Sequence, residues 1–299
     1  MNLLAIDIGQ SGSRVDINGI KRDLLIFHEP GASLEETLKK ILQDIPKQDF
    51  DVVAISATGL NGKVSADLKL INVAHQFSGT KKMVVIDDGL AGHFDVYGDK
   101  DGVTLLIGGG VVCVSSYQNN YLHLEGLGPF FGDLGGGFWL GTRGLSSALA
   151  TREGRENAQD LLNYLKDELN IFDQLKSKTG PDAFSLALAC ARKVLEAAEV
   201  GITSAVEIRK QGANYLAKTA HQSWMRLDPD PKELEVVTIF GGLSKNQGYL
   251  KEIEKNLLEM NQNTQVKTGH FYNLQGAIWA AKNLDKDIPP LLKWFNIKI

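Results

Sequence analysis

The chain of 299 residues is long enough for two ordinary domains, and its 43% hydrophobic and 23% charged residues are typical of a globular protein. Its formal net charge of −4 argues against a nucleic-acid partner, and no apolar run reaches the roughly 18–20 residues that span a bilayer, so we expect no membrane partner. No basic segment precedes the first apolar run, and the cysteines Cys113 and Cys190 are far apart, so we expect a cytoplasmic protein.

The first predicted element is a strand, a tight turn and a second strand within residues 3–17. The apolar run ends near Asp7, and alternation resumes at Val15 after a turn rich in glycine and serine. Small side chains let backbone N–H groups and hydroxyls face one centre, as phosphate binding requires. Asp7 is placed to hold Mg²⁺ through water, although a plain hairpin with a solvated Asp7 fits this stretch equally well. The candidate phosphate-binding residues are Gly9, Gln10, Ser11, Gly12 and Ser13.

A third strand, a helix and a buried strand are predicted next. Residues 23–27 form the strand, and Ser33 begins the helix through a capping-box pattern with Glu36. The strand 51–56 has an apolar centre and is expected to be buried, with Gly59 in the loop at its carboxyl end. Ligands bind at this edge of open α/β sheets, so the loop is a candidate binding segment.

The following buried strand, residues 81–86, ends in two adjacent carboxylates, Asp87 and Asp88, directly before a helical pattern. Asp is a preferred N-cap residue. The positive end of a helix also favours the ionised carboxylate that a general base requires. Two adjacent aspartates allow both roles, with one capping the helix and the other facing a cleft.

Residues 103–115 repeat the strand, glycine turn and strand of the first stretch, with Gly108, Gly109 and Gly110 at the turn. Two such hairpins, far apart in the sequence, suit the binding of one polyphosphate from two sides. The ordered pair resembles the arrangement of the actin-like sugar-kinase superfamily.

The segment 126–141 is too glycine-rich at its start for a helix, and a helix is expected from Phe138. Within it, Asp133 is the single charge in an apolar run. A buried aspartate must be paired or hydrogen-bonded. Hydroxyls of a bound sugar would satisfy Asp133, and so would backbone amides.

The rest of the chain is predicted to be mostly helical. Helices fill residues 157–200 and 203–221, and Gly201 separates them. A buried strand is predicted at residues 235–240. The turn after that strand contains Gly241, Gly242 and Leu243.

Four segments in this order resemble the N-acetylglucosamine kinase / BadF–BcrA ATPase family. They are residues 7–11, 87–92, 108–111 and 132–141. The last segment, Gly-Asp-Leu-Gly-Gly-Gly-Phe-Trp-Leu-Gly, is a long and specific match. The turn at 241–246 is similar to the family's adenosine loop, so the resemblance extends over nearly the whole chain.

The resemblance implies an α/β fold of two actin-like (ribonuclease H-like) domains, each a mixed five-stranded sheet flanked by helices, with a cleft between them. The first domain would span residues 1–115, joined by the segment 285–299. The second would span residues 116–284 and carry a helical insertion. The long helices within 157–220 are candidates for a homodimer contact.

The resemblance also implies an ATP-dependent kinase that phosphorylates a small-molecule amino sugar, with N-acetylglucosamine as the first candidate. Asp88 would take the proton from the attacking sugar hydroxyl, and Asp7 would be the protein partner of Mg²⁺. The ATP-binding residues would be Gly9, Gln10, Ser11, Gly12, Ser13, Gly108, Gly109, Gly110, Gly201, Gly241, Gly242 and Leu243. The sugar-binding residues would be Ser33, Gly59, Gly126, Leu127 and Asp133.

Several positions depart from the family pattern. Ile8 and Gln10 stand where the family prefers glycine, Gly109 and Val111 where threonine and serine are usual, and Leu134 in place of a glutamate. These departures keep open a nucleotide- or sugar-binding sensor without turnover. A BadF-type ATPase that drives electron transfer in a partner enzyme is the other alternative, although two isolated cysteines do not form a cluster-binding pattern.

Overall fold

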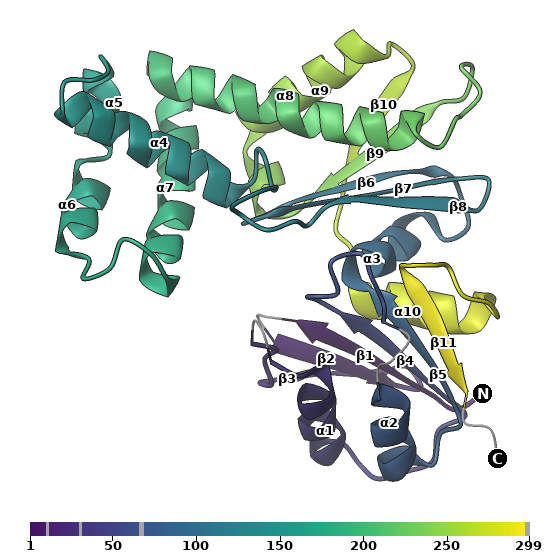
Figure 1. Cartoon of the computed structure of the whole chain (residues 1–299). Helices are drawn as coiled ribbons and strands as arrows, with labels where there is room; N and C mark the ends of the chain where they lie inside the picture. Colours follow the sequence, from purple (N-terminus) through teal and green to yellow (C-terminus); the bar gives the residue numbers. More distant parts are fainter. Residues whose placement is uncertain (10–11, 30–31, 66–68, 297–299) are drawn as a thin grey trace. The chain divides into compact units, whose positions relative to one another are not determined.

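A computed structural model of the chain describes residues 1–9, 12–29, 32–65 and 69–296 and divides the chain into two compact units (Figure 1). Unit 1 joins Met1–Asp101 to Phe271–Ile299, and unit 2 is Gly102–His270. Boundaries had been expected after residues 115 and 284. The structure places them earlier, because both strands of the second glycine hairpin belong to the sheet of unit 2 and the helix after residue 271 packs within unit 1.

Unit 1 is built on a mixed sheet of six strands in the order β11-β5-β4-β1-β2-β3. Five strands had been expected, and the sixth is β11, which pairs antiparallel with β5. The third strand covers residues 20–24, earlier than the expected 23–27, because it pairs with β2 through a tight turn. The strands are β1 (Leu3–Gly9), β2 (Gly12–Ile17), β3 (Ile20–Leu24), β4 (Val52–Ala57), β5 (Lys82–Asp87) and β11 (Leu292–Asn296).

The parallel strands β1, β4 and β5 form the buried centre of this sheet. Their registers pair Ile8 with Ala57 and Ala57 with Asp87, so their carboxyl ends meet at one edge. Their continuous apolar runs suit a sheet covered on both faces. Figure 1 shows α1 and α2 on one face and α3 and α10 on the other. These helices are α1 (Leu34–Asp44), α2 (Leu70–Ser78), α3 (Asp88–Tyr97) and α10 (Asn273–Asn283).

Unit 2 has a mixed sheet of five strands in the order β10-β9-β6-β7-β8, as expected for each domain. The strands are β6 (Gly102–Ile107), β7 (Val111–Tyr117), β8 (Asn120–Glu125), β9 (Glu235–Phe240) and β10 (Thr264–Thr268). Its helices are α4 (Gly137–Arg152), α5 (Gln159–Tyr164), α6 (Lys166–Gln174), α7 (Pro181–Glu199), α8 (Thr203–Met225), the 3₁₀ helix η1 (Gly242–Lys245) and α9 (Gln247–Met260). The predicted break at Gly201 is confirmed, since this residue separates α7 from α8 with φ +85°.

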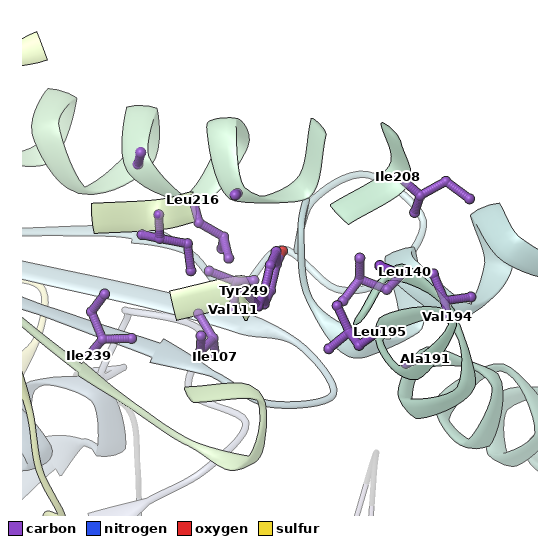
Figure 2. Packing of buried hydrophobic residues seen from close by; sticks show 14 of the residues in the cluster. Ile107, Val111, Leu140, Ala191, Val194, Leu195, Ile208, Leu216, Ile239 and Tyr249 are labelled. Carbon is purple, nitrogen blue, oxygen red and sulfur yellow. The ribbon is translucent and has the colours of Figure 1, made fainter. Parts of the chain in front are cut away.

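The core of unit 2 joins the sheet to its helices. Figure 2 shows Leu216 of α8 and Tyr249 of α9 beside the strand residues Ile107 and Val111, all in one buried cluster. The Tyr249 hydroxyl donates to the Gly135 carbonyl oxygen at 2.7 Å, so a buried polar atom of the core also holds the segment before α4.

Helices α4 and α7 cross closely in unit 2. A Cβ atom at Gly141 of α4 would overlap the Ala187 carbonyl oxygen of α7, so only glycine fits at this crossing. Among the described residues, no helix has both the length and the apolar character needed to cross a membrane.

Candidate functional site

Two aspartates follow β5 at the carboxyl edge of the unit 1 sheet. Asp87 caps α3: its Oδ1 accepts a hydrogen bond from the Gly89 N–H at 3.0 Å, and its Oδ2 accepts one from the Gly62 N–H at 2.9 Å. Both carboxylate oxygens of Asp87 are therefore engaged by the backbone. Asp88 occupies the first position of the helix and is left for another role.

The Asp88 carboxyl group lies among other polar groups of the same edge. Burial is the main cause that raises the pKa of Asp88 to about 7, and the nearby carboxylates of Asp87 and Asp7 raise it further. A hydrogen bond with the Thr58 side chain, from the loop after β4, opposes this rise. A carboxyl group that changes charge near neutral pH can exchange a proton with a hydroxyl group.

Asp7 lies near the end of β1 and is only 4% exposed. Burial raises the pKa of the Asp7 carboxyl, while Arg14 and a hydrogen bond with Asn273 counteract the shift. The Arg14 Nη1 atom lies 3.3 Å from Asp7 Oδ2. Asp7 is thus held from two sides, by β2 and by the start of α10.

The carboxylates of this edge match part of the ligand set that Mg²⁺ prefers. Within the described ranges, no three His, Cys, Asp or Glu side chains come together as a metal-binding group. Mg²⁺ in phosphoryl-transfer sites usually takes one or two carboxylates and completes its shell with water and phosphate oxygens. Asp7, whose charge raises the pKa of the nearby Asp88, fits such a partial set of ligands.

The first glycine turn connects β1 to β2. A Cβ atom at Gly9 would lie 2.7 Å from the Gly12 carbonyl oxygen, and Gly12 has φ +139°, so both positions require glycine. The Ser13 hydroxyl donates to the Ile26 carbonyl oxygen at 2.7 Å and is directed into the fold. Two further candidates in this turn, Gln10 and Ser11, lie outside the described residues.

The sugar-binding candidates of unit 1 lie in two loops of that unit. Ser33 caps α1, with its hydroxyl oxygen accepting from the Glu36 N–H at 3.4 Å, which confirms the predicted helix start. Gly59 has φ +80° and lies beside the imidazole of His28. The His28 N–H donates to the Gly9 carbonyl oxygen at 3.0 Å, so this buried histidine connects the loops after β1 and β4. The sequence did not indicate this role of His28, because a single histidine in a loop forms no recognisable pattern.

In unit 2, the second glycine hairpin is bound to the start of α4. The Gly108 N–H donates to the Gly110 carbonyl oxygen at 2.9 Å. The carbonyl oxygens of Gly108 and Gly109 accept hydrogen bonds from the N–H groups of Gly137 and Phe138 at 2.8 and 2.9 Å. The second glycine hairpin and the glycine-rich segment before α4 are therefore hydrogen-bonded directly to each other.

Asp133 lies against this hairpin. Its carboxylate accepts backbone hydrogen bonds from Val111 and Gly126, and burial raises its pKa. A Cβ atom at Gly110 would lie 2.6 Å from Asp133 Oδ2, so glycine is needed there for the carboxylate to fit. Asp133 Oδ1 is buried and has no hydrogen-bond partner in the part of the chain that the structure describes. Backbone amides therefore leave one of the two carboxylate oxygens of Asp133 without a hydrogen bond. Leu127, a sugar-binding candidate of the same segment, is exposed.

The turn after β9 reaches the same edge of the unit 2 sheet. Strands β6 and β9 are parallel, and a Cβ atom at Gly241 would overlap the Ile107 carbonyl oxygen, directly before Gly108. Gly242 and Leu243 begin η1. Gly201 follows α7 and has φ +85° with open space around it, as befits a turn at the protein surface.

Comparisons with known proteins agree with this architecture. Residues 25–282 match the BadF/BadG/BcrA/BcrD ATPase family. A Chromobacterium violaceum protein assigned as an N-acetylglucosamine kinase is 18% identical with a TM-score of 0.61, covering 92% of this chain and 97% of that chain. A protein with the same assignment from Porphyromonas gingivalis is 14% identical with a TM-score of 0.63, covering 94% and 99%. None of the curated proteins matches the sequence.

A ROK family glucokinase from Streptomyces griseus, solved with glucose and AMPPNP, is also similar in structure. It is 18% identical with a TM-score of 0.52, covering 93% of this chain and 98% of that chain. Similarity at these identities establishes the fold alone, which is two mixed sheets flanked by helices.

Proposed function

The chain belongs to the BadF/BadG/BcrA/BcrD ATPase family, and we propose on this basis that it is an ATP-dependent kinase acting on a hydroxyl group of an amino sugar. N-acetylglucosamine is the first acceptor to test. The fold shared with proteins assigned as N-acetylglucosamine kinases supports the proposal. Two buried, free cysteines favour the cytoplasm, where ATP is available.

The observation that carries the proposal is the environment of Asp88. Its carboxyl has a pKa raised to about 7 by burial and by the neighbouring carboxylates of Asp87 and Asp7. Such a group is ionised in a useful fraction at neutral pH and is basic enough to accept a proton from a hydroxyl. In the proposed reaction, Asp88 removes the proton as the sugar oxygen attacks the γ-phosphoryl group.

The other candidates have positioning roles. The glycine turns at Gly9 and Gly12 and at Gly108–Gly110 present backbone groups without Cβ atoms, which suits contact with phosphate oxygens. Gly241, Gly242, Leu243 and Gly201 would contact adenosine. Asp7 would hold Mg²⁺, which when bound neutralises phosphate charge. Phosphoryl transfer depends mainly on such positioning and charge neutralisation.

The acceptor site is proposed to lie around Asp133. Its buried Oδ1 atom has no hydrogen-bond partner among the described residues and would accept a hydrogen bond from a sugar hydroxyl. Leu127, Phe130 and Phe131 are exposed apolar side chains of the same segment of unit 2. Contact with them would bury the methyl group of an N-acetyl substituent, which favours an acetylated amino sugar over a plain hexose.

A sensor without turnover is a second candidate, because specific hydroxyls are missing or engaged. The Ser13 hydroxyl donates a hydrogen bond to the Ile26 carbonyl oxygen. The second hairpin carries Gly109 and Val111 instead of hydroxyl-bearing residues. These positions therefore supply fewer hydroxyl donors to phosphate oxygens than the same positions in a typical member of the family.

The test is ADP release from ATP and Mg²⁺ in the presence of a panel of hexoses, amino sugars and N-acetylated amino sugars. Release that depends on an amino sugar supports the kinase. Release without any sugar indicates an ATPase of the BadF type. ATP binding without release in any condition indicates the sensor. An iron and sulfide assay of the purified protein checks the ATPase alternative separately.

A further inference from the structure

His28 lies in the loop between β3 and α1 and is only 6% exposed. Its backbone N–H donates to the Gly9 carbonyl oxygen at 3.0 Å, and its imidazole lies beside Gly59 in the loop after β4. Gly59 directly follows Thr58, whose side chain hydrogen-bonds with Asp88. His28 therefore borders the carboxyl edge of the unit 1 sheet, and the proposed function gives its imidazole no role.

The hydrogen bonds around His28 determine which ring nitrogen carries the proton. The Nδ1 atom lies 3.1 Å from the Thr37 hydroxyl oxygen. That hydroxyl has a single hydrogen, which it donates to the Ser33 carbonyl oxygen at 3.3 Å. The Thr37 oxygen is thus left to accept a hydrogen bond from Nδ1–H. Burial lowers the pKa of the His28 imidazole, so the ring is neutral at neutral pH and its Nε2 atom carries a lone pair and no proton.

The Nε2 atom of His28 has no hydrogen-bond partner among the described residues. It faces Gly59 on the side where another residue would carry its side chain. A Cβ atom there would lie 3.8 Å from Nε2 and 3.9 Å from the ring carbon Cδ2. Apart from the neighbours of Gly59 in the chain, no other described atom lies within 4 Å of that point. Gly59 has φ +80°, which favours glycine, so the loop leaves this space beside Nε2 unfilled.

The chemistry of an unprotonated imidazole nitrogen defines what it can bind. Such a nitrogen accepts a hydrogen bond and cannot donate one. It therefore suits a hydroxyl group and gives no hydrogen bond to a phosphate or carboxylate oxygen. A buried acceptor that is left unpaired costs free energy. A ligand that places a donor beside Nε2 is thus favoured over a ligand of the same shape without that donor.

We propose that His28 Nε2 accepts a hydrogen bond from a hydroxyl group of the acceptor sugar. The inference rests on the proposed function. The contacting hydroxyl is not the one that is phosphorylated, because the reacting hydroxyl gives its proton to Asp88. His28 is then a residue that selects among sugars, since an ether oxygen or a fluorine at the contacting position cannot donate a hydrogen bond. Thr37 is the positioning residue that keeps the proton on Nδ1.

The test is a calorimetric titration of the full chain with N-acetylglucosamine and with analogues in which one hydroxyl at a time is replaced by fluorine. Wild-type protein should bind one of these analogues about five- to tenfold more weakly than the parent sugar, because the donor to Nε2 is lost. His28→Asn keeps an N–H group for Thr37 and removes Nε2. This variant should bind the parent sugar more weakly by the same factor and should no longer discriminate against that analogue.

The matched control is His75→Asn in α2, where Nδ1 bonds to the Thr80 carbonyl oxygen at 2.9 Å, and it should discriminate like wild type. ATP affinity should stay within about threefold of wild type in both variants, which shows that the nucleotide site is intact. If N-acetylglucosamine binds equally to wild type and His28→Asn, the role of His28 is overturned and the proposed acceptor stands. If N-acetylglucosamine does not bind to the wild-type protein, the proposed acceptor and the role of His28 fail together.

A measurement on the free protein tests the position of the proton. In long-range ¹H–¹⁵N spectra, the His28 Nδ1 signal should be that of a protonated nitrogen and the Nε2 signal that of an unprotonated one, with both assigned by their loss in His28→Asn. Thr37→Val removes the hydroxyl and should abolish the preference for this tautomer. A proton on Nε2 in the wild-type protein would overturn the proposal, whatever sugar the protein phosphorylates.

Discussion

Asp87 and Asp88 are neighbours in the chain with different roles at the start of α3. The Asp87 carboxylate accepts hydrogen bonds from the Gly62 and Gly89 N–H groups at 2.9 and 3.0 Å. The Asp88 carboxyl interacts with Thr58 and has a pKa raised to about 7. Because Asp87 satisfies the end of the helix, Asp88 is free to serve chemistry, and the first predictions concern this residue.

Replacing Asp88 by asparagine should reduce phosphoryl transfer by about 10²–10⁴-fold, because the general base is lost while the shape of the side chain is kept. ATP affinity should stay within about threefold of wild type, since the proposed nucleotide contacts lie elsewhere. Steady-state ADP release and calorimetric ATP binding measure the two quantities. Asp99→Asn, at an exposed position after α3, is the control and should behave like wild type. Near-normal turnover in Asp88→Asn would remove Asp88 from the mechanism.

The activity should rise with pH through neutrality. A general base works in its ionised form, and the pKa of Asp88 is raised to about 7, so kcat/KM should fall about tenfold per pH unit below that value. The measurement is a rate profile from about pH 5.5 to 8.5 with a direct assay of the phosphorylated product. A profile that is flat across this range would contradict the assignment.

The same pKa predicts a pH-dependent gain in stability for Asp88→Asn. The folded-state pKa of Asp88, about 7, lies above the ordinary value of 3.8 for an aspartate, so between these pH values the folded state holds a proton that the unfolded state has released. The contribution of Asp88 to the free energy of unfolding therefore falls as pH rises from about 4 to 7. Asparagine has no proton to lose, so the variant should be more stable than wild type by up to about 4 kcal/mol at pH 8 and nearly equal at pH 4, since each unit of pKa shift corresponds to about 1.4 kcal/mol. Urea unfolding at the two pH values tests this, and equal differences at both would contradict it.

Asp133→Asn should weaken acceptor binding much more than ATP binding. The change removes the charge but keeps a residue that tolerates φ +56°. We expect the KM for the sugar to rise at least about tenfold, with ATP affinity changed by less than about threefold. Asp228→Asn is the matched control, because Asp228 has φ +54° and is exposed. Equal losses for both ligands would mean that Asp133 mainly supports the hairpin.

Gly141→Ala should destabilise unit 2. The added methyl group would overlap the Ala187 carbonyl oxygen where α4 and α7 cross, and the helices must separate to accept it. Overpacking of this kind costs about 1–3 kcal/mol. Thermal or urea unfolding gives the value, with Ser146→Ala at an exposed position of α4 as the control. Unchanged stability would show that the crossing adjusts without strain.

Local patterns in the sequence predicted most of the elements that build the candidate site. The glycine turns, the buried strands and the break at Gly201 each depend on residues that are separated by only a few positions in the chain. The adjacency of Asp87 and Asp88 was enough to predict that one caps α3. These features depend on short-range geometry, which sequence spacing records directly.

Features set by distant contacts were harder to predict. The unit boundaries depend on which strands pair, and β6 pairs with β9 from far along the chain. The sixth strand of unit 1 likewise depends on the return of β11 to β5. The Ser13 hydroxyl looked available for phosphate, but the folding back of the next loop places the Ile26 carbonyl beside it. None of these partners is visible in local spacing.

The return of α10 and β11 to unit 1 has a consequence for synthesis. A nascent chain that has emerged only to residue 101 lacks the helix that packs on α3 and the strand that pairs with β5. Its β5 edge is then open to other strands, which is a known route to aggregation. Unit 2, which is continuous, has all its strands available sooner. We therefore expect unit 2 to finish folding on the ribosome first. Unit 1, which carries Asp7 and Asp88, is complete only after residue 296 has been translated, and we expect it to rely on chaperones until then.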